Sequence, residues 1–270
     1  MKNKKVRALV ESAIMIAVAT VLSMIKIIDL PYGGSVTIAS MFPIAIISYR
    51  YGTKWGLSTA LVYGVLQQLL GLNTLSYVTT WQSVVAIILL DYVIAFAVAG
   101  LGGAFRNVTS NQPIAFALGS LLVCILRYLC HVISGATVWA GISIPTKAAL
   151  IYSFVYNATY MIPEAIIMII VAVYIGSIMN FKANIPTRII NSKYNAAASL
   201  LTALAGLPVT AALIADVALV FSKLQNAETG EFAIEQIAEV NWVLIGIISV
   251  GAAALAAVLF LIGMSKRKAA

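Results

Sequence analysis

Long runs of apolar residues, separated by short polar segments, dominate the chain. A helix needs about 20 mostly apolar residues to cross the ~30 Å hydrocarbon core of a bilayer. The pattern predicts eight helices, over residues 8–28, 36–49, 56–71, 81–104, 113–135, 148–178, 196–221 and 241–263. The second and third are short for complete spans, and Pro43 inside the second predicts a bend or a tilt.

Composition supports the membrane interpretation. Of the 270 residues, 62% are hydrophobic and 10% are charged, whereas soluble domains are about 45–50% apolar and ~25% charged. The alternation of membrane strands is absent, so we expect an all-α integral membrane protein. One histidine and two cysteines, Cys124 and Cys130, cannot form a zinc site or a disulfide within one helix. No metal or other cofactor is therefore expected.

Lysines and arginines are divided unevenly between the two sides of the predicted membrane. If the N-terminus is cytoplasmic, thirteen lie inside: Lys2, Lys4, Lys5, Arg7, Arg50, Lys54, Arg106, Lys182, Arg188, Lys193, Lys266, Arg267 and Lys268. Only Lys26, Lys147 and Lys223 lie outside, and Arg127 falls within a helix. This imbalance predicts a multi-pass protein of the cell membrane with both termini cytoplasmic.

Polar stretches divide the chain into segments. The N-terminal segment is expected to be a retained helix and not a signal peptide, because Glu11 interrupts its start and the apolar run continues to Met24. A later polar and basic stretch predicts a cytoplasmic linker. The expected domains are a six-helix bundle over 1–180, the linker over 181–195 and a transmembrane helix pair over 196–270.

Polar side chains within the predicted helices concentrate in the outer half of the membrane. At 1.5 Å per residue, five of them lie ~6–15 Å below the outer surface: Asp91, Arg127, His131, Tyr152 and Asn157. Such residues normally face the bundle interior. Together with the phenol of Tyr92 and the indole of Trp139, they predict a pocket for a small aromatic cation.

Structural and enzymatic interpretations compete with this pocket. Asp91 and Arg127 can form a structural ion pair across adjacent helices, with Glu164 as a second partner for Arg127. Glu164 can also be a polar plug below the pocket or a coupling residue. Ser134 beside His131 is a conceivable nucleophile, but the chain lacks G-x-S-x-G and H-E-x-x-H, so no enzyme is predicted.

The chain contains four short segments, AIMIA, LDYVIA, RYLCHVISGATVW and YSFVYN, and in this order they resemble the thiamine-specific S components of energy-coupling factor vitamin transporters. AIMIA (Ala13 to Ala17) resembles the family's small-xxx-small motif, and LDYVIA resembles its L-E-Y stretch. RYLCHVISGATVW places a histidine and a tryptophan eight residues apart as in the family, and YSFVYN resembles its Y-S-x-x-x-N. The resemblance covers about residues 8–180, and the order and spacing of the four segments make it specific.

The resemblance implies a six-helix subunit that binds a vitamin from outside with high affinity. Such a subunit docks to a transmembrane coupling protein that carries two cytoplasmic ATPases. The resemblance implies ligand-binding roles for Asp91, Tyr92, His131, Gly135, Trp139, Tyr152 and Asn157. Ala13 and Ala17 would let the coupling protein approach closely. The chain has no Walker A sequence, so ATP hydrolysis would belong to the partners.

The chain departs from the family pattern in three places. The family's glutamate is Asp91 here, an aromatic residue of the first outer loop is replaced within YGGSV around Gly34, and two helices are added at the C-terminus. Two other functions stay open. One is an S component for a thiamine precursor, and the other is a stand-alone secondary transporter in which Asp91, Arg127 and Glu164 serve proton coupling.

Overall fold

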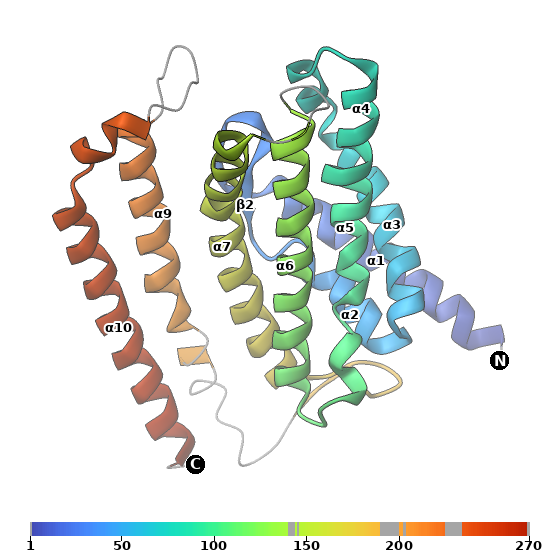
Figure 1. Ribbon diagram of the computed structural model, residues 1–270. Helices are drawn as coiled ribbons and strands as arrows, with labels where there is room; N and C mark the ends of the chain where they lie inside the picture. The colour runs from blue at the N-terminus through green and yellow to red at the C-terminus, as the bar shows by residue number, and fades with distance from the viewer. Residues whose placement is uncertain are drawn as a thin grey trace. The chain divides into compact units, whose positions relative to one another are not determined.

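The structure, a computed structural model, describes residues 2–139, 144, 146–189, 200–201, 204–224 and 234–268. The chain forms two compact units, Met1–Ile189 and Ile190–Ala270. Among the described residues, five helices are long and apolar enough to cross a membrane: Lys4–Met24, Trp81–Asn107, Gln112–Thr137, Lys147–Ile178 and Trp242–Gly263. The predicted class, an all-α multi-pass membrane protein, is confirmed (Figure 1).

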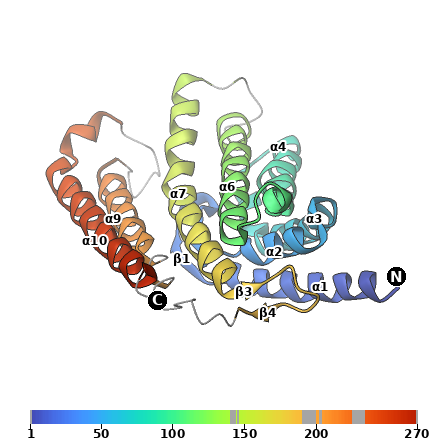
Figure 2. The same ribbon diagram turned by 90° about the horizontal axis from the view of Figure 1, so that it is seen from below.

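The first unit begins with α1 (Lys2–Met24), β1 (Lys26–Asp29), the short helix η1 (Pro31–Gly33) and β2 (Ser35–Thr37). It continues with α2 (Phe42–Tyr51), α3 (Thr53–Leu70) and η2 (Leu72–Tyr77). One long composite helix follows, made of α4 (Trp81–Ile87), η3 (Ile88–Ile94), α5 (Ala95–Ala97), η4 (Val98–Leu101) and η5 (Ala104–Asn107). The unit ends with α6 (Gln112–Thr137), α7 (Lys147–Ile178) and the two-stranded hairpin of β3 (Met179–Asn180) and β4 (Thr187–Arg188). Figure 2 shows α1 lying across the end of the unit where this hairpin is found.

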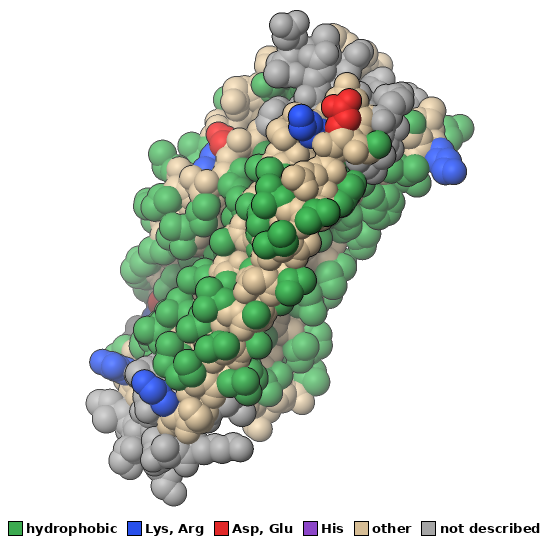
Figure 3. Space-filling model, turned by 90° about the vertical axis from the view of Figure 1, so that its left-hand side faces the viewer, with side chains coloured by type: hydrophobic (Ala, Val, Ile, Leu, Met, Phe, Trp, Pro, Cys, Tyr) green, Lys and Arg blue, Asp and Glu red, His purple; other side chains and the backbone are tan. Residues whose placement is uncertain are grey.

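The second unit, within its described residues, contains α9 (Gly206–Leu224), the short helix η6 (Ile234–Glu239) and α10 (Trp242–Lys268). The Ser249 hydroxyl of α10 donates a 2.6 Å hydrogen bond to Asp216 of α9. Figure 3 shows the face that carries α10, where hydrophobic side chains cover the middle and charged side chains lie toward the ends. The expected start of a helix at residue 196 lies outside the described residues.

The second predicted helix, over 36–49, is wrong at its start. The chain is extended over β2, which pairs antiparallel with β1, and α2 begins only at Phe42. Pro43 lies in the first turn of α2, where a backbone N–H would have no partner within the helix. Its missing N–H therefore costs no hydrogen bond, and it does not bend the middle of a helix. The first helix likewise ends at Met24, because the following residues form β1.

The non-helical segment from β2 to the start of α2 is largely buried inside the bundle. Val36 and Met41 are fully enclosed. Backbone polar groups in such a place need partners within the protein. The carboxylate of Glu164, from the middle of α7, accepts hydrogen bonds from the Thr37 N–H and, at 2.7 Å, from the Thr37 hydroxyl. Glu164 therefore holds a non-helical strand of chain within the membrane-spanning bundle.

Aromatic packing joins the helices at the end of the unit near α2. The ring of Phe116, on α6, lies 5.3 Å from the ring of Phe42 and 4.4 Å from that of Tyr49, both on α2. It also lies 5.4 Å from the ring of Phe181, which follows β3. This cluster fixes α2, α6 and the hairpin against one another, and the polar site lies toward the other end of α6.

Candidate functional site

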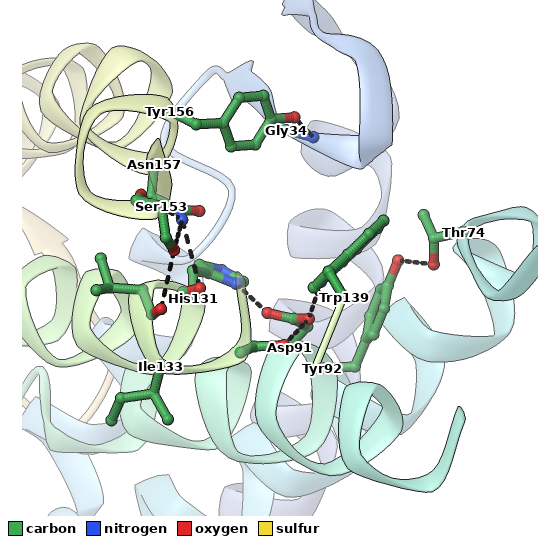
Figure 4. Close-up of polar contacts among 12 residues, drawn as sticks. Gly34, Thr74, Asp91, Tyr92, His131, Ile133, Trp139, Ser153, Tyr156 and Asn157 are labelled. Atoms are coloured by element: carbon green, nitrogen blue, oxygen red, sulfur yellow. Dashed lines mark hydrogen bonds and ion pairs between the residues drawn. The ribbon is translucent and has the colours of Figure 1, made fainter. Parts of the chain in front are cut away.

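The centre of the candidate site is the carboxylate of Asp91, which is 8% exposed. One oxygen, Oδ1, lies 2.7 Å from Nδ1 of His131. The other, Oδ2, accepts hydrogen bonds from the Ser134 hydroxyl at 2.5 Å and from Nε1 of Trp139 at 3.1 Å. Figure 4 shows the side chains of His131, on α6, and Trp139, just after it, pointing toward Asp91. Hydrogen bonds from several donors stabilise the negative charge of a buried carboxylate.

The local backbone explains how Asp91 and Tyr92 reach the site. Both lie in η3, a π-helical turn, and such wide turns often occur at functional sites. The Tyr92 hydroxyl is 2.8 Å from the Thr74 hydroxyl, which anchors the ring to η2. Gly71 makes this approach possible, because a Cβ atom there would lie 2.3 Å from the Tyr92 hydroxyl.

Helix α7 forms the opposite wall. The Asn157 amide donates to the Ser153 backbone carbonyl at 2.8 Å and to the His131 carbonyl at 3.3 Å, so it bridges α7 and α6. The Tyr160 hydroxyl donates to the Asn157 side-chain oxygen at 2.5 Å. At Gly135 the two helices meet closely, since a Cβ atom would lie 2.4 Å from the Ser153 hydroxyl. The tyrosine rings of α7 then line the wall, with Tyr152 and Tyr156 stacked at 5.9 Å.

An aromatic cluster completes the site, and the sequence reasoning missed most of it. The ring of Tyr32 lies 5.3 Å from that of Tyr77, 6.1 Å from Trp139 and 6.4 Å from Tyr156. Tyr32 has a φ of 64°, which directs the ring out of η1 and is unusual for a non-glycine residue. The segment between β1 and β2 therefore does supply an aromatic ring, two residues before Gly34, where the sequence suggested that one was lost. The tyrosine beside two glycines in YGGSV was the available signal.

The predicted ion pair among Asp91, Arg127 and Glu164 is not formed. Asp91 is engaged by donors from α6, and Glu164 binds Thr37. The Arg127 guanidinium carbon instead lies 4.4 Å from the centre of the Phe96 ring, and Nη1 contacts the sulfur of Met41 at 3.7 Å. Cation–π attraction therefore replaces the expected salt bridge at this buried arginine.

The arrangement does not suit nucleophilic catalysis. Among the contacts of the described residues, Ser134 donates to Asp91 and forms no hydrogen bond with the His131 ring. A serine nucleophile needs its hydroxyl to donate to the base, so the carboxylate occupies the place that the imidazole would take.

The two alanines of the small-xxx-small motif, Ala13 and Ala17, are exposed on α1, an element separate from those that build the site.

Comparison with known proteins identifies the family to which this chain is related. Residues 9–184 match the family described as thiamine transporter protein (Thia_YuaJ). The thiamine transporter ThiT of Bacillus subtilis (strain 168) is 36% identical over 181 residues, which are 63% of this chain and 90% of the relative. The match runs from within α1 to the turn after β3, and so contains the whole candidate site. The chain therefore belongs to the thiamine transporter protein family.

Proposed function

We propose that the chain is the thiamine-binding S component of an energy-coupling factor importer, which captures the vitamin from outside for ATP-driven uptake by partner subunits. The observation that carries this proposal is the Asp91 carboxylate, held by three side-chain contacts beside a cluster of aromatic rings. Thiamine joins a positively charged thiazolium ring to a flat aminopyrimidine. A buried negative charge next to aromatic faces is the environment that binds such a molecule.

The proposed site comprises Asp91, Tyr92, His131, Gly135, Trp139, Tyr152 and Asn157. Asp91 balances the thiazolium charge, while Trp139 and the tyrosines provide faces for the rings. His131 has a specific role that follows from its tautomer. In a neutral imidazole whose Nδ1 donates to the Asp91 carboxylate, Nε2 is an acceptor, and Nε2 is buried without a partner among the described residues. It accepts a hydrogen bond from the pyrimidine amino group.

Uptake would require partners, since the chain lacks an ATP-binding motif. In the proposal, a transmembrane coupling protein approaches the exposed face of α1 at Ala13 and Ala17, and two cytoplasmic ATPases bind that coupling protein. In this proposal residues 1–180 form the capture bundle in the cell membrane, and 196–270 are an added helix pair. The linker over 181–195 is cytoplasmic, and its first part, through β4, packs against the bundle. Both chain termini are cytoplasmic in this arrangement, which the distribution of lysine and arginine supports.

Titration of the purified protein with thiamine, followed by tryptophan fluorescence, tests the binding step. We expect saturable quenching, because Trp139 lies in the proposed site. Tighter binding of the isolated pyrimidine fragment than of thiamine would favour a precursor transporter instead. Uptake by cells that lack the ATPases tests the coupling step. Uptake that persists without them, but stops when the ion gradient is dissipated, would identify a secondary transporter.

A further inference from the structure

Arg50, at the end of α2, forms a buried polar junction that the proposed site does not involve. Its side chain is only 5% exposed. Nε and Nη2 donate to the two carboxylate oxygens of Glu11 at 2.8 and 3.1 Å, which is the bidentate geometry that arginine forms with a carboxylate. Nη1 donates to the carbonyl of Phe181 at 2.9 Å and to that of Ala183 at 3.2 Å. Nη2 also donates to the carbonyl of Asn184 at 3.0 Å.

These contacts join three parts of the first unit. Glu11 belongs to α1, Arg50 to α2, and the three carbonyls to the turn between β3 and β4, residues 181–184. A second arginine, Arg7 of α1, donates to the Asn184 side chain at 2.5 Å. The turn is therefore tied to α1 by two arginines, one from α2 and one from α1 itself.

The junction orients a helix that is otherwise largely exposed. Side chains along the outer face of α1 are more than half exposed, including Val6, Leu9, Val10, Ile14 and Val21. The alanines proposed to meet the coupling protein lie on this face, at Ala13 and Ala17. Arg50 contacts Glu11 from the bundle side of α1, two residues before Ala13. A small rotation of α1 about its axis would turn the alanines away from a partner.

The turn is also connected to the candidate site through one unbroken helix. Helix α7 runs from Lys147 to Ile178, carries Asn157 and the site tyrosines, and leads directly into β3. Gln112 at the start of α6 fixes the same place, since its amide donates to the Gly176 carbonyl at 2.8 Å and its oxygen accepts from the Phe181 N–H at 3.0 Å. A change in the position of α7 is therefore a change in the position of the carbonyls that Arg50 binds.

We propose that Arg50 is a positioning residue for uptake. It holds α1 against the turn at residues 181–184, at the angle that presents Ala13 and Ala17 to the coupling protein. This inference rests on the proposed function. Lysine cannot replace arginine here, because its single ammonium group cannot bind a carboxylate through two donors and contact three carbonyls in the same plane.

The test compares R50Q and R50K with R106Q. Arg106 is a matched control, because it donates to the Tyr49 carbonyl at the end of α2 and, among the described residues, forms no hydrogen bond or ion pair with α1 or the turn. Initial thiamine uptake by cells expressing the full chain should fall about tenfold or more in both Arg50 variants, since charge-assisted hydrogen bonds contribute on this scale. Thiamine affinity of the purified variants should stay within about threefold of the original, a change below one hydrogen bond. Backbone amide exchange should rise in α1 and in the turn, while R106Q changes none of the three measurements.

Each other outcome decides against the inference. Normal uptake by R50Q, even with faster exchange in α1, would show that the junction serves only stability. Equal losses of uptake and of thiamine affinity would show general damage to the fold. A13W, measured in the same strain, separates this inference from the proposed function. If A13W abolishes uptake and R50Q does not, only the role of Arg50 is wrong. If A13W leaves uptake intact, docking through α1 is wrong and the role of Arg50 is wrong with it.

Discussion

Replacing Asp91 by asparagine should weaken thiamine binding far more than replacing it by glutamate. Asparagine keeps one acceptor, which can still face His131, but puts an amide donor where Oδ2 now accepts from Ser134 and Trp139. The indole N–H of Trp139 can only donate, so two donors would then face each other. The variant therefore loses a hydrogen bond to the site tryptophan as well as the negative charge.

The size of the effect follows from these two losses. A unit charge ~5 Å from a cation contributes ~3 kcal/mol at an effective dielectric constant of ~20. A hydrogen bond to a charged group adds ~1.5–3 kcal/mol. Because the carboxylate is also desolvated when a ligand covers it, we expect a net loss of ~2–4 kcal/mol, or roughly 30- to 700-fold in Kd. Asp91→Glu keeps the charge at the cost of one added methylene, so its loss should stay below ~1.5 kcal/mol, or about tenfold.

Isothermal titration calorimetry is the suitable assay, because Trp139 bonds to Asp91 and its fluorescence would change with the substitution itself. Two ligands should be compared: thiamine, which is cationic, and its pyrimidine fragment, which is neutral. Only thiamine experiences the lost charge, so the Asn variant should penalise thiamine more than the fragment. Equal affinity of the Asn variant and the original protein for thiamine would remove Asp91 from the site. Equal penalties for the two ligands would refute the electrostatic part of the reasoning.

Three other variants test separate features. A chain ending at Asn195 should bind thiamine within about threefold of the full chain, because the candidate site lies wholly in the first unit; lost binding in a monodisperse preparation would contradict this. Glu164→Leu should lower the thermal midpoint by several degrees, because the buried Thr37 groups lose their acceptor at ~1–3 kcal/mol each, whereas Glu164→Gln, which keeps one acceptor, should lower it less. Tyr32→Ala should weaken thiamine binding about tenfold while Tyr32→Phe stays near normal, as aromatic contacts contribute ~0.5–1.5 kcal/mol beyond their buried area; similar affinities for the two in calorimetry would exclude a role for the ring.

Sequence patterns identified the features that depend on one helix at a time. Long apolar runs gave the extents of α6 and α7 to within two residues. The four-residue spacing of Arg127 and His131 correctly placed both on the buried side of α6. Depth along the helices placed Asp91 and His131 in the same half of the membrane, and the structure brings their side chains into contact.

Features that depend on several elements at once were not predictable in the same way. A short buried strand and a buried helix have the same apolar composition, so nothing in residues 36–41 distinguished β2 and its continuation from a helix. The partner of Arg127 depends on how far α6 is rotated about its axis, which spacing along one helix does not determine. Tyr32 was missed because its position depends on a left-handed backbone conformation in η1.

The contact between Thr37 and Glu164 has a consequence for synthesis of the protein. The two residues are 127 positions apart in the chain, and the buried Thr37 N–H has its acceptor on α7, where lipid could not supply one. At ~5–20 residues per second, the ribosome needs roughly 6–25 s to add those residues. During that interval Glu164 has not yet been synthesised, so α2 and the segment before it lack the contact that holds them inside the bundle. The N-terminal third of the bundle must therefore wait, sheltered at the insertion machinery or at the membrane surface, until α7 emerges and closes around it.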